Sequence, residues 1–274
     1  MRRLAPLVAF VSALTLTGAA GAVGPTLPAV EGGPGVSIGD VSYVTHLAPE
    51  QTTILAKRRH GRVVSTRELP GRWGVPLVTY GSPPGGLSPD GRVLVLSDAV
   101  DISGRLRARS RFAVVDTRTL SLTRTITLRG DYSFDALSPQ AKTLYLIHHV
   151  SNEDATKYQV QAYDLGLGRL LPRVIADRRQ AGWIMDGFPV TRATSAGGRW
   201  VYTFYRQNEN YPFVHALDTV DRTAICIGIP ADWVNGAWID GAKLRLAGGK
   251  LLIAGPAGKL RYALDTKTFR VTTA

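Results

Sequence analysis

The sequence has few residues that could form covalent cross-links or bind metal ions. Cys226 is the only cysteine among 274 residues, so no disulfide bond can form within the chain. The five histidines and this cysteine show no zinc-ligand spacing. His148 and His149 are adjacent and would face opposite sides of a strand, so they cannot bind one metal ion together. We therefore expect neither a metal site nor a cofactor.

Common signatures of catalysis are also absent. The sequence contains no Gly-x-Ser-x-Gly nucleophile elbow, no glycine-rich phosphate loop and no His-Glu zinc helix. Cys226 lies between isoleucines, an apolar setting that disfavours the reactive thiolate. These absences favour a binding or scaffold role over an enzymatic one.

Long apolar runs occur only at the N-terminus. Leu4–Leu16 follows the basic pair Arg2–Arg3, and small residues follow it at positions 20–22, as in a secretory signal peptide. We expect residues 1–22 to be a signal peptide and residues 23–35 a flexible N-terminal segment. The mature protein is then secreted or otherwise extracytoplasmic, in the periplasm or outside the cell envelope. No later segment is long and apolar enough to be a transmembrane helix.

Lysine is scarce relative to arginine, with 7 lysines and 26 arginines in a chain of net charge +12. A basic surface attracts polyanions, whereas an arginine-rich genome would produce the same bias without any binding role. Arg105, Arg107, Arg109 and Arg111 alternate in RLRARSR and would project to one side of an extended segment. Such charge runs usually mark a solvated loop, which is the favoured interpretation. The other hypothesis is that the four arginines contact a polyanion, such as an anionic envelope polymer. Nucleic acid is not an expected partner outside the cytoplasm.

Helical periodicity is absent as well, and near-repeated phrases take its place. GGLSPDGRVLVLSDA at residues 85–99 is matched by ALSPQAKTLYLIHHV at residues 136–150. The turn phrases LAPEQ, LSPDG, LSPQA, TSAGG and LAGGK precede strand-like runs, and a second phrase such as VVDTRT follows them. This second phrase recurs at spacings of 51, 48, 54 and 47 residues. Its key position holds Ser65, Asp116, Asp164, Asp218 and Asp265.

A unit of roughly 50 residues with four short strands has the size of one β-propeller blade. The repeats predict an all-β fold, a single propeller domain over residues 36–274 with about five four-stranded blades that close into a ring. Six blades would require Val36–Val44 to belong to an extra sheet. The repeated Asp side chains are predicted to bond their own downstream backbone in turns, rather than to form a ring of carboxylates.

The phrases LSPDGR and VVDTRT resemble those of secreted bacterial WD40-like and YVTN-type β-propeller repeat proteins. The resemblance covers nearly the whole mature chain. It implies that strands a to d of each blade run outward from the axis. The a–b and c–d turns then share one face, and the b–c loops and d–a crossovers share the other. It implies no particular reaction, because such propellers serve many roles.

Long loops and tryptophans both fall on the b–c and d–a face of this expected fold. Four of the five tryptophans lie in segments predicted as d–a crossovers. We predict a ligand site there, because aromatic rings with a few polar groups suit a carbohydrate or a peptide. The alternative is that each indole is a wedge between blades. The candidate residues are Trp73, Trp183, Asp186, Trp233, Asn235, Trp238 and Asp240.

The sequence therefore favours a secreted propeller that binds or scaffolds an unknown protein, peptide or glycan through this face. The alternative is a propeller-type hydrolase or lyase acting on glycans. That chemistry would need Asp135, Asp186 and Asp240 to converge on one sugar at the mouth of the channel.

Overall fold

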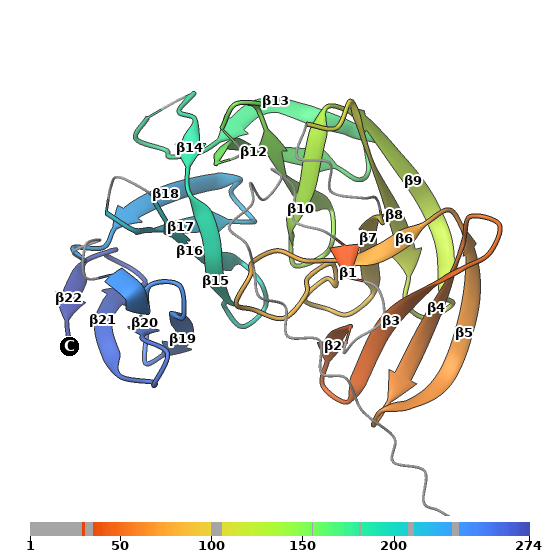
Figure 1. Cartoon of the computed structure of the whole chain (residues 1–274), viewed down its shortest axis with the longest axis horizontal. Helices are drawn as coiled ribbons and strands as arrows, with labels where there is room; N and C mark the ends of the chain where they lie inside the picture. The colour runs from red at the N-terminus through yellow and green to blue at the C-terminus, as the bar shows by residue number, and fades with distance from the viewer. Residues whose placement is uncertain are drawn as a thin grey trace, which may run out of the picture.

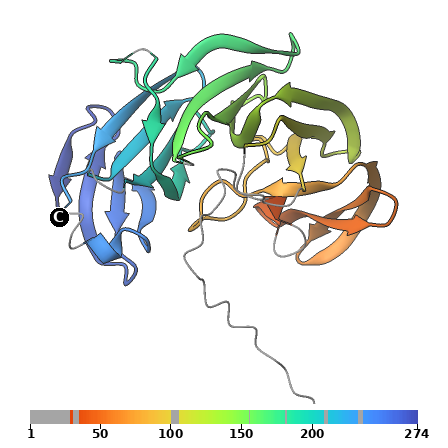
Figure 2. The ribbon, with the colours of Figure 1, turned by 45° about the horizontal axis from the view of Figure 1, so that its top comes forward.

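The computed structural model describes residues 29–30, 35–99, 106–154, 156–180, 182–207, 211–231 and 236–274. It confirms the all-β fold, with five antiparallel sheets that follow one another along the chain. The described strands follow an arc whose two ends are the first and last sheets, where a closed ring was expected (Figure 2). The one helical segment among the described residues is the short η1 (Gly236–Trp238), and none of them forms a helix suited to cross a membrane.

The sheets are called blades 1 to 5 in chain order (Figure 1). Blade 1 consists of β2 (Val36–Ile38), β3 (Val41–Ala48), β4 (Thr52–Arg59) and β5 (Arg62–Pro70). Blade 2 consists of β6 (Trp73–Pro76), β7 (Val93–Asp98), β8 (Arg109–Asp116) and β9 (Ser121–Arg129), with β1 (Ala29–Val30) paired to β6. Blade 3 consists of β10 (Asp131–Leu137), β11 (Thr143–His149), β12 (Lys157–Asp164) and β13 (Arg169–Ile175), with β14 (Met185–Asp186) paired to β12. Blade 4 consists of β15 (Phe188–Thr194), β16 (Trp200–Arg206), β17 (Phe213–Asp218) and β18 (Thr223–Gly228). Blade 5 consists of β19 (Lys243–Ala247), β20 (Lys250–Ala254), β21 (Leu260–Asp265) and β22 (Val271–Thr273).

The repeated Asp residues form turns between the third and fourth strands, as predicted. The Oδ1 atom of Asp116 accepts hydrogen bonds from the backbone N–H groups of Arg118 and Thr119, both at 2.9 Å. Asp164, Asp218 and Asp265 accept the equivalent pairs at 2.8–3.0 Å. These backbone hydrogen bonds are the main reason why the pKa of Asp116 is lowered. Four of the five blades therefore share one turn chemistry.

Blade 1 departs from the predicted repeat phase. Its third and fourth strands are joined at His60 and Gly61, whose φ angles of 48° and 77° suit a tight hairpin turn without an Asp. Ser65 consequently lies within β5, opposite Lys57, and the LAPEQ segment joins β3 to β4. Val36–Val44 lies in β2 and β3, so it belongs to blade 1 and not to an extra sheet.

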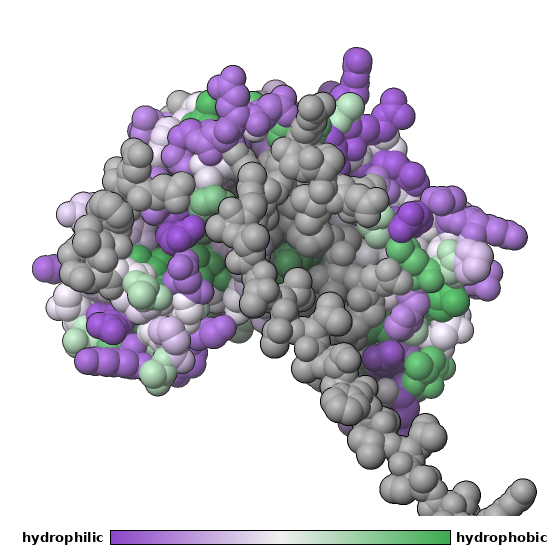
Figure 3. All heavy atoms as spheres, in the orientation of Figure 1, coloured by the Kyte–Doolittle hydropathy of each residue, from purple (hydrophilic) through white to green (hydrophobic). Residues whose placement is uncertain are grey.

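Aromatic side chains fill the space between blades 3 and 4. The ring of Tyr205 stacks on Tyr158 at 5.4 Å and on Phe213 at 5.0 Å between centroids. All three residues are buried, together with Met185. The outer rim is largely hydrophilic, with scattered hydrophobic residues (Figure 3). The molecule thus combines an apolar interior between its blades with a charged periphery.

The inner strand of blade 2 is interrupted by a loop, called here the crossing loop (residues 77–84). The chain leaves at Pro76 and returns at Gly85, whose N–H bonds the Pro76 carbonyl at 2.8 Å. The loop reaches β15, where the Gly81 N–H donates to the Val190 carbonyl at 2.8 Å. Lys243 of blade 5 also donates to the Gly81 carbonyl, at 3.1 Å. The segment predicted as one long crossover is therefore a strand followed by a loop that spans the centre of the molecule.

Candidate functional site

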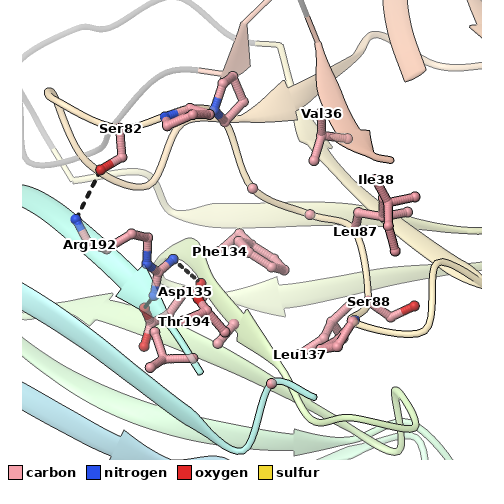
Figure 4. A pocket seen from close by; sticks show the side chains of 18 of the residues that line it. Val36, Ile38, Ser82, Leu87, Ser88, Phe134, Asp135, Leu137, Arg192 and Thr194 are labelled. Carbon is pink, nitrogen blue, oxygen red and sulfur yellow. Dashed lines mark hydrogen bonds and ion pairs between the residues drawn. The ribbon is translucent and has the colours of Figure 1, made fainter. Parts of the chain in front are cut away.

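A pocket of about 410 Å³, called the axial pocket, lies among the inner strands of blades 1 to 4 (Figure 4). Its walls include residues of the a–b turns, such as Ser88 and Ser195, so it lies toward the face opposite to the predicted one. One side of the pocket is apolar and contains Phe134 and Leu137. The crossing loop lines another part of it.

The hydrogen-bonding groups on the polar side of the axial pocket bond largely to one another. The Arg192 guanidinium donates to Asp135 Oδ1 at 2.9 Å and to the Asp135 carbonyl at 2.6 Å. The backbone N–H of Arg192 donates to Ser82 Oγ of the crossing loop at 2.9 Å. Asp135 belongs to β10 and Arg192 to β15, so these bonds tie together blade 3, blade 4 and the crossing loop (Figure 4). The charges mainly serve to hold these elements together.

A larger pocket of about 600 Å³ lies on the predicted face, and we call it the Trp183 pocket. It forms where the crossover after β13 meets the b–c loop of blade 4. The crossover contributes the partly exposed ring of Trp183, and the loop contributes Tyr211, which is 63% exposed. The amides of Gln180 and Gln207 also line this pocket, and in the described part of the chain neither amide side chain has a hydrogen-bond partner. The pocket thus combines accessible aromatic rings with unused donors and acceptors.

A buried carboxylate fixes the backbone beside the Trp183 pocket. Asp177 Oδ2 accepts hydrogen bonds from Arg179 Nη2 at 2.6 Å and from the Cys226 N–H at 3.0 Å. Burial alone would raise the pKa of Asp177, but the hydrogen bonds from Arg179 and the backbone outweigh it and lower the pKa. Burial raises the pKa of the Cys226 thiol, so this side chain is unsuited to act as a nucleophile.

The described tryptophans lie at separate places. Trp73 is fully buried in β6, donates from Nε1 to the Pro70 carbonyl at 2.7 Å and stacks under Arg111. It is a core residue, as the wedge alternative proposes. Trp238 lies in η1 and packs near Phe204 of blade 4, with ring centroids 6.1 Å apart. Neither residue lines the Trp183 pocket. The other two candidates of this region, Trp233 and Asn235, lie outside the described residues.

The three candidate acids do not converge. Asp135 lies on the innermost strand of blade 3, whereas Asp186 lies on β14, beyond β11 and β12. Three strand spacings separate them by about 14 Å, more than the roughly 5–10 Å of paired glycosidase carboxylates. Asp186 accepts hydrogen bonds from Thr156 and Lys157, each at 2.5 Å.

Asp240, the third acid, is exposed and lies 3.4 Å from Arg206 at the far end of β16. Arg206 pairs with Phe188, four residues before Arg192 on β15. Four residues of a strand span about 13 Å, which separates Asp240 from the Asp135–Arg192 pair. Each acid therefore has a different cation as its neighbour, and none is placed to act with another on one glycosidic bond.

Two of the four alternating arginines at positions 105–111 are paired with acids. Arg107 donates to Asp131 Oδ1 from Nε at 3.0 Å and from Nη2 at 2.9 Å, and also to the Tyr132 carbonyl. Arg111 lies 3.8 Å from an oxygen of Asp98. Arg109 is exposed in β8, and Arg105 lies outside the described residues. Two of the four charges are thus balanced by acids that lie far away in the sequence or across the sheet.

Sequence reasoning located the loops of the Trp183 pocket but missed most of its residues. The crossover and the b–c loop stood out by their length, and Trp183 by its type. Tyr211, Gln180 and Gln207 carry no pattern of their own in the sequence. Within the residues that the structure describes, no group of His, Cys, Asp and Glu side chains is arranged to hold a metal ion.

No protein-family model and no curated protein sequence matches the chain. Solved structures match its fold at low sequence identity. Hydrazine synthase of Kuenenia stuttgartiensis aligns with a TM-score of 0.50 and 18% identity, over 83% of this chain and 62% of that one. The Dos1 propeller aligns with a TM-score of 0.48 and 10% identity, over 85% of this chain and 58% of that one. TolB of Acinetobacter baumannii aligns with a TM-score of 0.41 and 15% identity, over 84% of this chain and 53% of that one.

The chain spans less than two thirds of each of these three matched chains. The five successive antiparallel sheets define the class of fold, an all-β structure consistent with a five-bladed β-propeller. At these identities the similarity extends to the fold alone, so any function must be argued from the sites.

Proposed function

We propose that this chain is an exported β-propeller that binds a glycan, without catalysing a reaction, through the Trp183 pocket on its b–c and d–a face. The observation that carries the proposal is the meeting of Trp183 and Tyr211, two accessible rings from separate loops. Beside them lie the amides of Gln180 and Gln207, which have no hydrogen-bond partner among the described residues. Aromatic faces pack against the apolar faces of sugar rings, and amides supply both a donor and an acceptor for hydroxyl groups.

The binding role is favoured over the hydrolase or lyase alternative by the placement of the acids. Asp135 and Asp186 lie three strands apart, and Asp240 pairs with Arg206 on another element. Among the described residues, Asp177 is the only carboxylate that lines the Trp183 pocket, and its oxygens are occupied by Arg179 and the backbone. The described residues of this pocket thus offer a glycan hydrogen-bonding groups but no available pair of acid and base.

Isothermal titration calorimetry with neutral chito-, cello- and xylo-oligosaccharides tests this function. We expect one series to bind, and Trp183→Ala to weaken that binding about tenfold or more, because burial of one ring contributes about 1–3 kcal/mol. Trp183→Phe should retain part of the affinity. Trp238→Ala is the matched control, since Trp238 is also partly exposed but lies outside the pocket. Absence of binding by the unmodified protein, or equal affinity of the Trp183→Ala and Trp238→Ala variants, would contradict the proposal.

The location outside the cytoplasm is part of the same proposal and rests on the N-terminal sequence pattern. Protein purified from its natural host should begin near Val23 and carry no lipid. N-terminal sequencing that finds Met1 at the start of the purified protein would contradict export.

A further inference from the structure

A second pocket lies beside the Trp183 pocket, and three arginines surround it. This arginine pocket has a volume of about 310 Å³. Arg173 reaches it from β13, Arg178 from the crossover that follows, and Arg222 from the turn between β17 and β18. Three arginines from blades 3 and 4 and the crossover between them thus line one hollow.

None of the three charges has an acidic partner among the residues that the structure describes. Across the described residues, none of these guanidinium groups forms an ion pair or a side-chain hydrogen bond. Arg178 has one ring contact, with its Cζ 5.8 Å from the centre of the Phe269 ring. The arginines therefore retain nearly all of their hydrogen-bonding capacity.

The acids nearest to this pocket are already used by other arginines. Asp177 lines the arginine pocket, but its two oxygens accept from Arg179 and from the Cys226 N–H. Asp218 and Asp221 lie close to Arg222 in the sequence, and both bind Arg199, at 2.8 and 2.6 Å. The negative charges of this region are thus paired with other arginines, and none of the described ion pairs involves Arg173, Arg178 or Arg222.

An oxyanion is the natural ligand of guanidinium groups that line one pocket, because each can bind it with two parallel N–H donors. The pocket is concave and exceeds the size of one anionic group, so it has room for the group and for part of the molecule that carries it. A carboxylate, sulfate or phosphate substituent fits these features.

The two pockets adjoin along shared elements. Asp177 lines both pockets, and β18 contributes Thr223 and Ala224 to the arginine pocket and Cys226 and Gly228 to the Trp183 pocket. From Ala224 to Gly228 a strand rises about 13 Å, a distance that a short oligosaccharide can span. One extended ligand can therefore occupy both.

We propose that the arginine pocket binds the anionic substituent of an acidic glycan whose neighbouring sugar lies in the Trp183 pocket. The sugar part rests on the proposed function, whereas the anion site rests on Arg173, Arg178 and Arg222 alone.

Calorimetry with an oligogalacturonide and with the best-binding neutral oligosaccharide of equal length tests this inference. The unmodified protein should bind the acidic ligand at least about tenfold more tightly, since charge-assisted hydrogen bonds are the strong ones. The triple variant Arg173→Gln, Arg178→Gln, Arg222→Gln should lose this preference and keep its affinity for the neutral ligand. All three arginines are exposed, so the variant should keep the fold, which a thermal melt verifies.

The matched control removes the same charge elsewhere. Arg62, Arg118 and Arg245 are exposed, and none of them forms an ion pair within the described ranges. Changing all three to Gln should reduce the preference for the acidic ligand only slightly, through the lower net charge. An equal loss in both triple variants would overturn the anion site, because net charge alone would then explain the preference.

The outcomes also separate this inference from the proposed function. Equal affinity for the acidic and neutral ligands would overturn the anion site and leave the glycan site intact. Arginine-dependent binding of inorganic sulfate, with no binding of any neutral oligosaccharide, would support the anion site and contradict the glycan site. If the protein binds neither sulfate nor the oligogalacturonide, the anion site is wrong.

Discussion

The inner strands and the rim between blades 3 and 4 hold the same kinds of side chain in opposite situations. In the interior, Arg192 faces Asp135 and Arg107 faces Asp131, and each pair lies almost out of contact with solvent. At the rim, Arg173 and Arg222 are exposed and form no ion pair within the described part of the chain. The net charge of +12 is therefore a poor guide to binding, because only part of it is available to a ligand.

The tryptophans repeat this contrast. Trp73 has its ring fully buried and its Nε1–H bonded to Pro70, so it serves packing. Trp183 rests against the core between blades 3 and 4 but keeps part of its ring accessible in a pocket. Stability should thus depend on the inner residues and ligand binding on those of the rim, and each prediction below tests that division.

The largest effect is expected for Trp73→Ala, which should lower the free energy of unfolding by about 3–5 kcal/mol, because it empties a fully buried site. Urea denaturation followed by circular dichroism measures this. Trp183→Ala should lower the free energy of unfolding clearly less, because the Trp183 ring is only partly buried. Equal losses in the two variants would remove the distinction between core and rim tryptophans.

A somewhat smaller loss, about 3 kcal/mol, is expected for Arg107→Ala. The change removes the guanidinium from the carboxylate of Asp131, whose side chain is 0% exposed. The backbone N–H at position 107 still donates to Asp131 Oδ2, which limits the loss. Arg109→Ala, an exposed neighbour in β8, is the control and should change stability by no more than about 0.5 kcal/mol. If Arg107→Ala changes the free energy of unfolding as little as the control does, Arg107 belongs to a solvated loop.

A pH effect links the interior to the rim. His215 is buried, and its Nε2 lies 3.1 Å from the carbonyl of Ala176, at the start of the crossover that lines both rim pockets. Burial lowers its pKa, although the nearby carboxylates of Asp135 and Asp177 oppose this; Arg192 acts in the lowering direction. The folded protein then binds fewer protons than the unfolded chain, so stability is lost as the pH falls below about 6.5.

Melting temperatures between neutral and mildly acidic pH test this effect. The decline should be shallower in His215→Asn than in the unmodified protein. His148→Asn, which removes a second histidine of lowered pKa in blade 3, serves as the comparison. A pH dependence that is unchanged in His215→Asn would exclude this residue as its origin.

The smallest effect on stability is expected for Arg222→Gln. Its side chain is exposed and makes no ion pair among the described residues, so the free energy of unfolding should change by no more than about 0.5 kcal/mol. The same variant should weaken binding of an acidic oligosaccharide several-fold. A destabilised protein, or one with unchanged affinity, would mean that Arg222 belongs to the structural group of arginines.

The fold could be predicted because strand length, turn residues and repeat spacing are local properties. The Asp turns at Asp116 and Asp265 illustrate this, since each side chain bonds the backbone two and three residues later. The predicted repeat phase of blade 1 was wrong, because the turn between its third and fourth strands has positive φ angles at His60 and Gly61 and uses no Asp.

The site could be predicted only in part, because pairing and burial are set by residues distant in the sequence. Nothing near Arg107 indicates that Asp131 will neutralise it, 24 positions later. Likewise, Trp73 is buried by contacts from other strands, whereas Trp183 is left partly open. Loop length indicated the correct face for the Trp183 pocket, but the arginine pocket forms only where blades 3 and 4 pack together.

The division between paired and available arginines is tested most directly by nuclear magnetic resonance of the arginine side chains during a titration with sodium sulfate. The Nε–Hε signals of Arg173, Arg178 and Arg222 should shift together and saturate with one dissociation constant, because they surround one hollow. Those of the ion-paired Arg107 and Arg192 should stay in place. Signals of Arg62, Arg118 and Arg245 that follow the same saturable curve, or no response from the three arginines of the pocket, would contradict the division on which the proposed anion site depends.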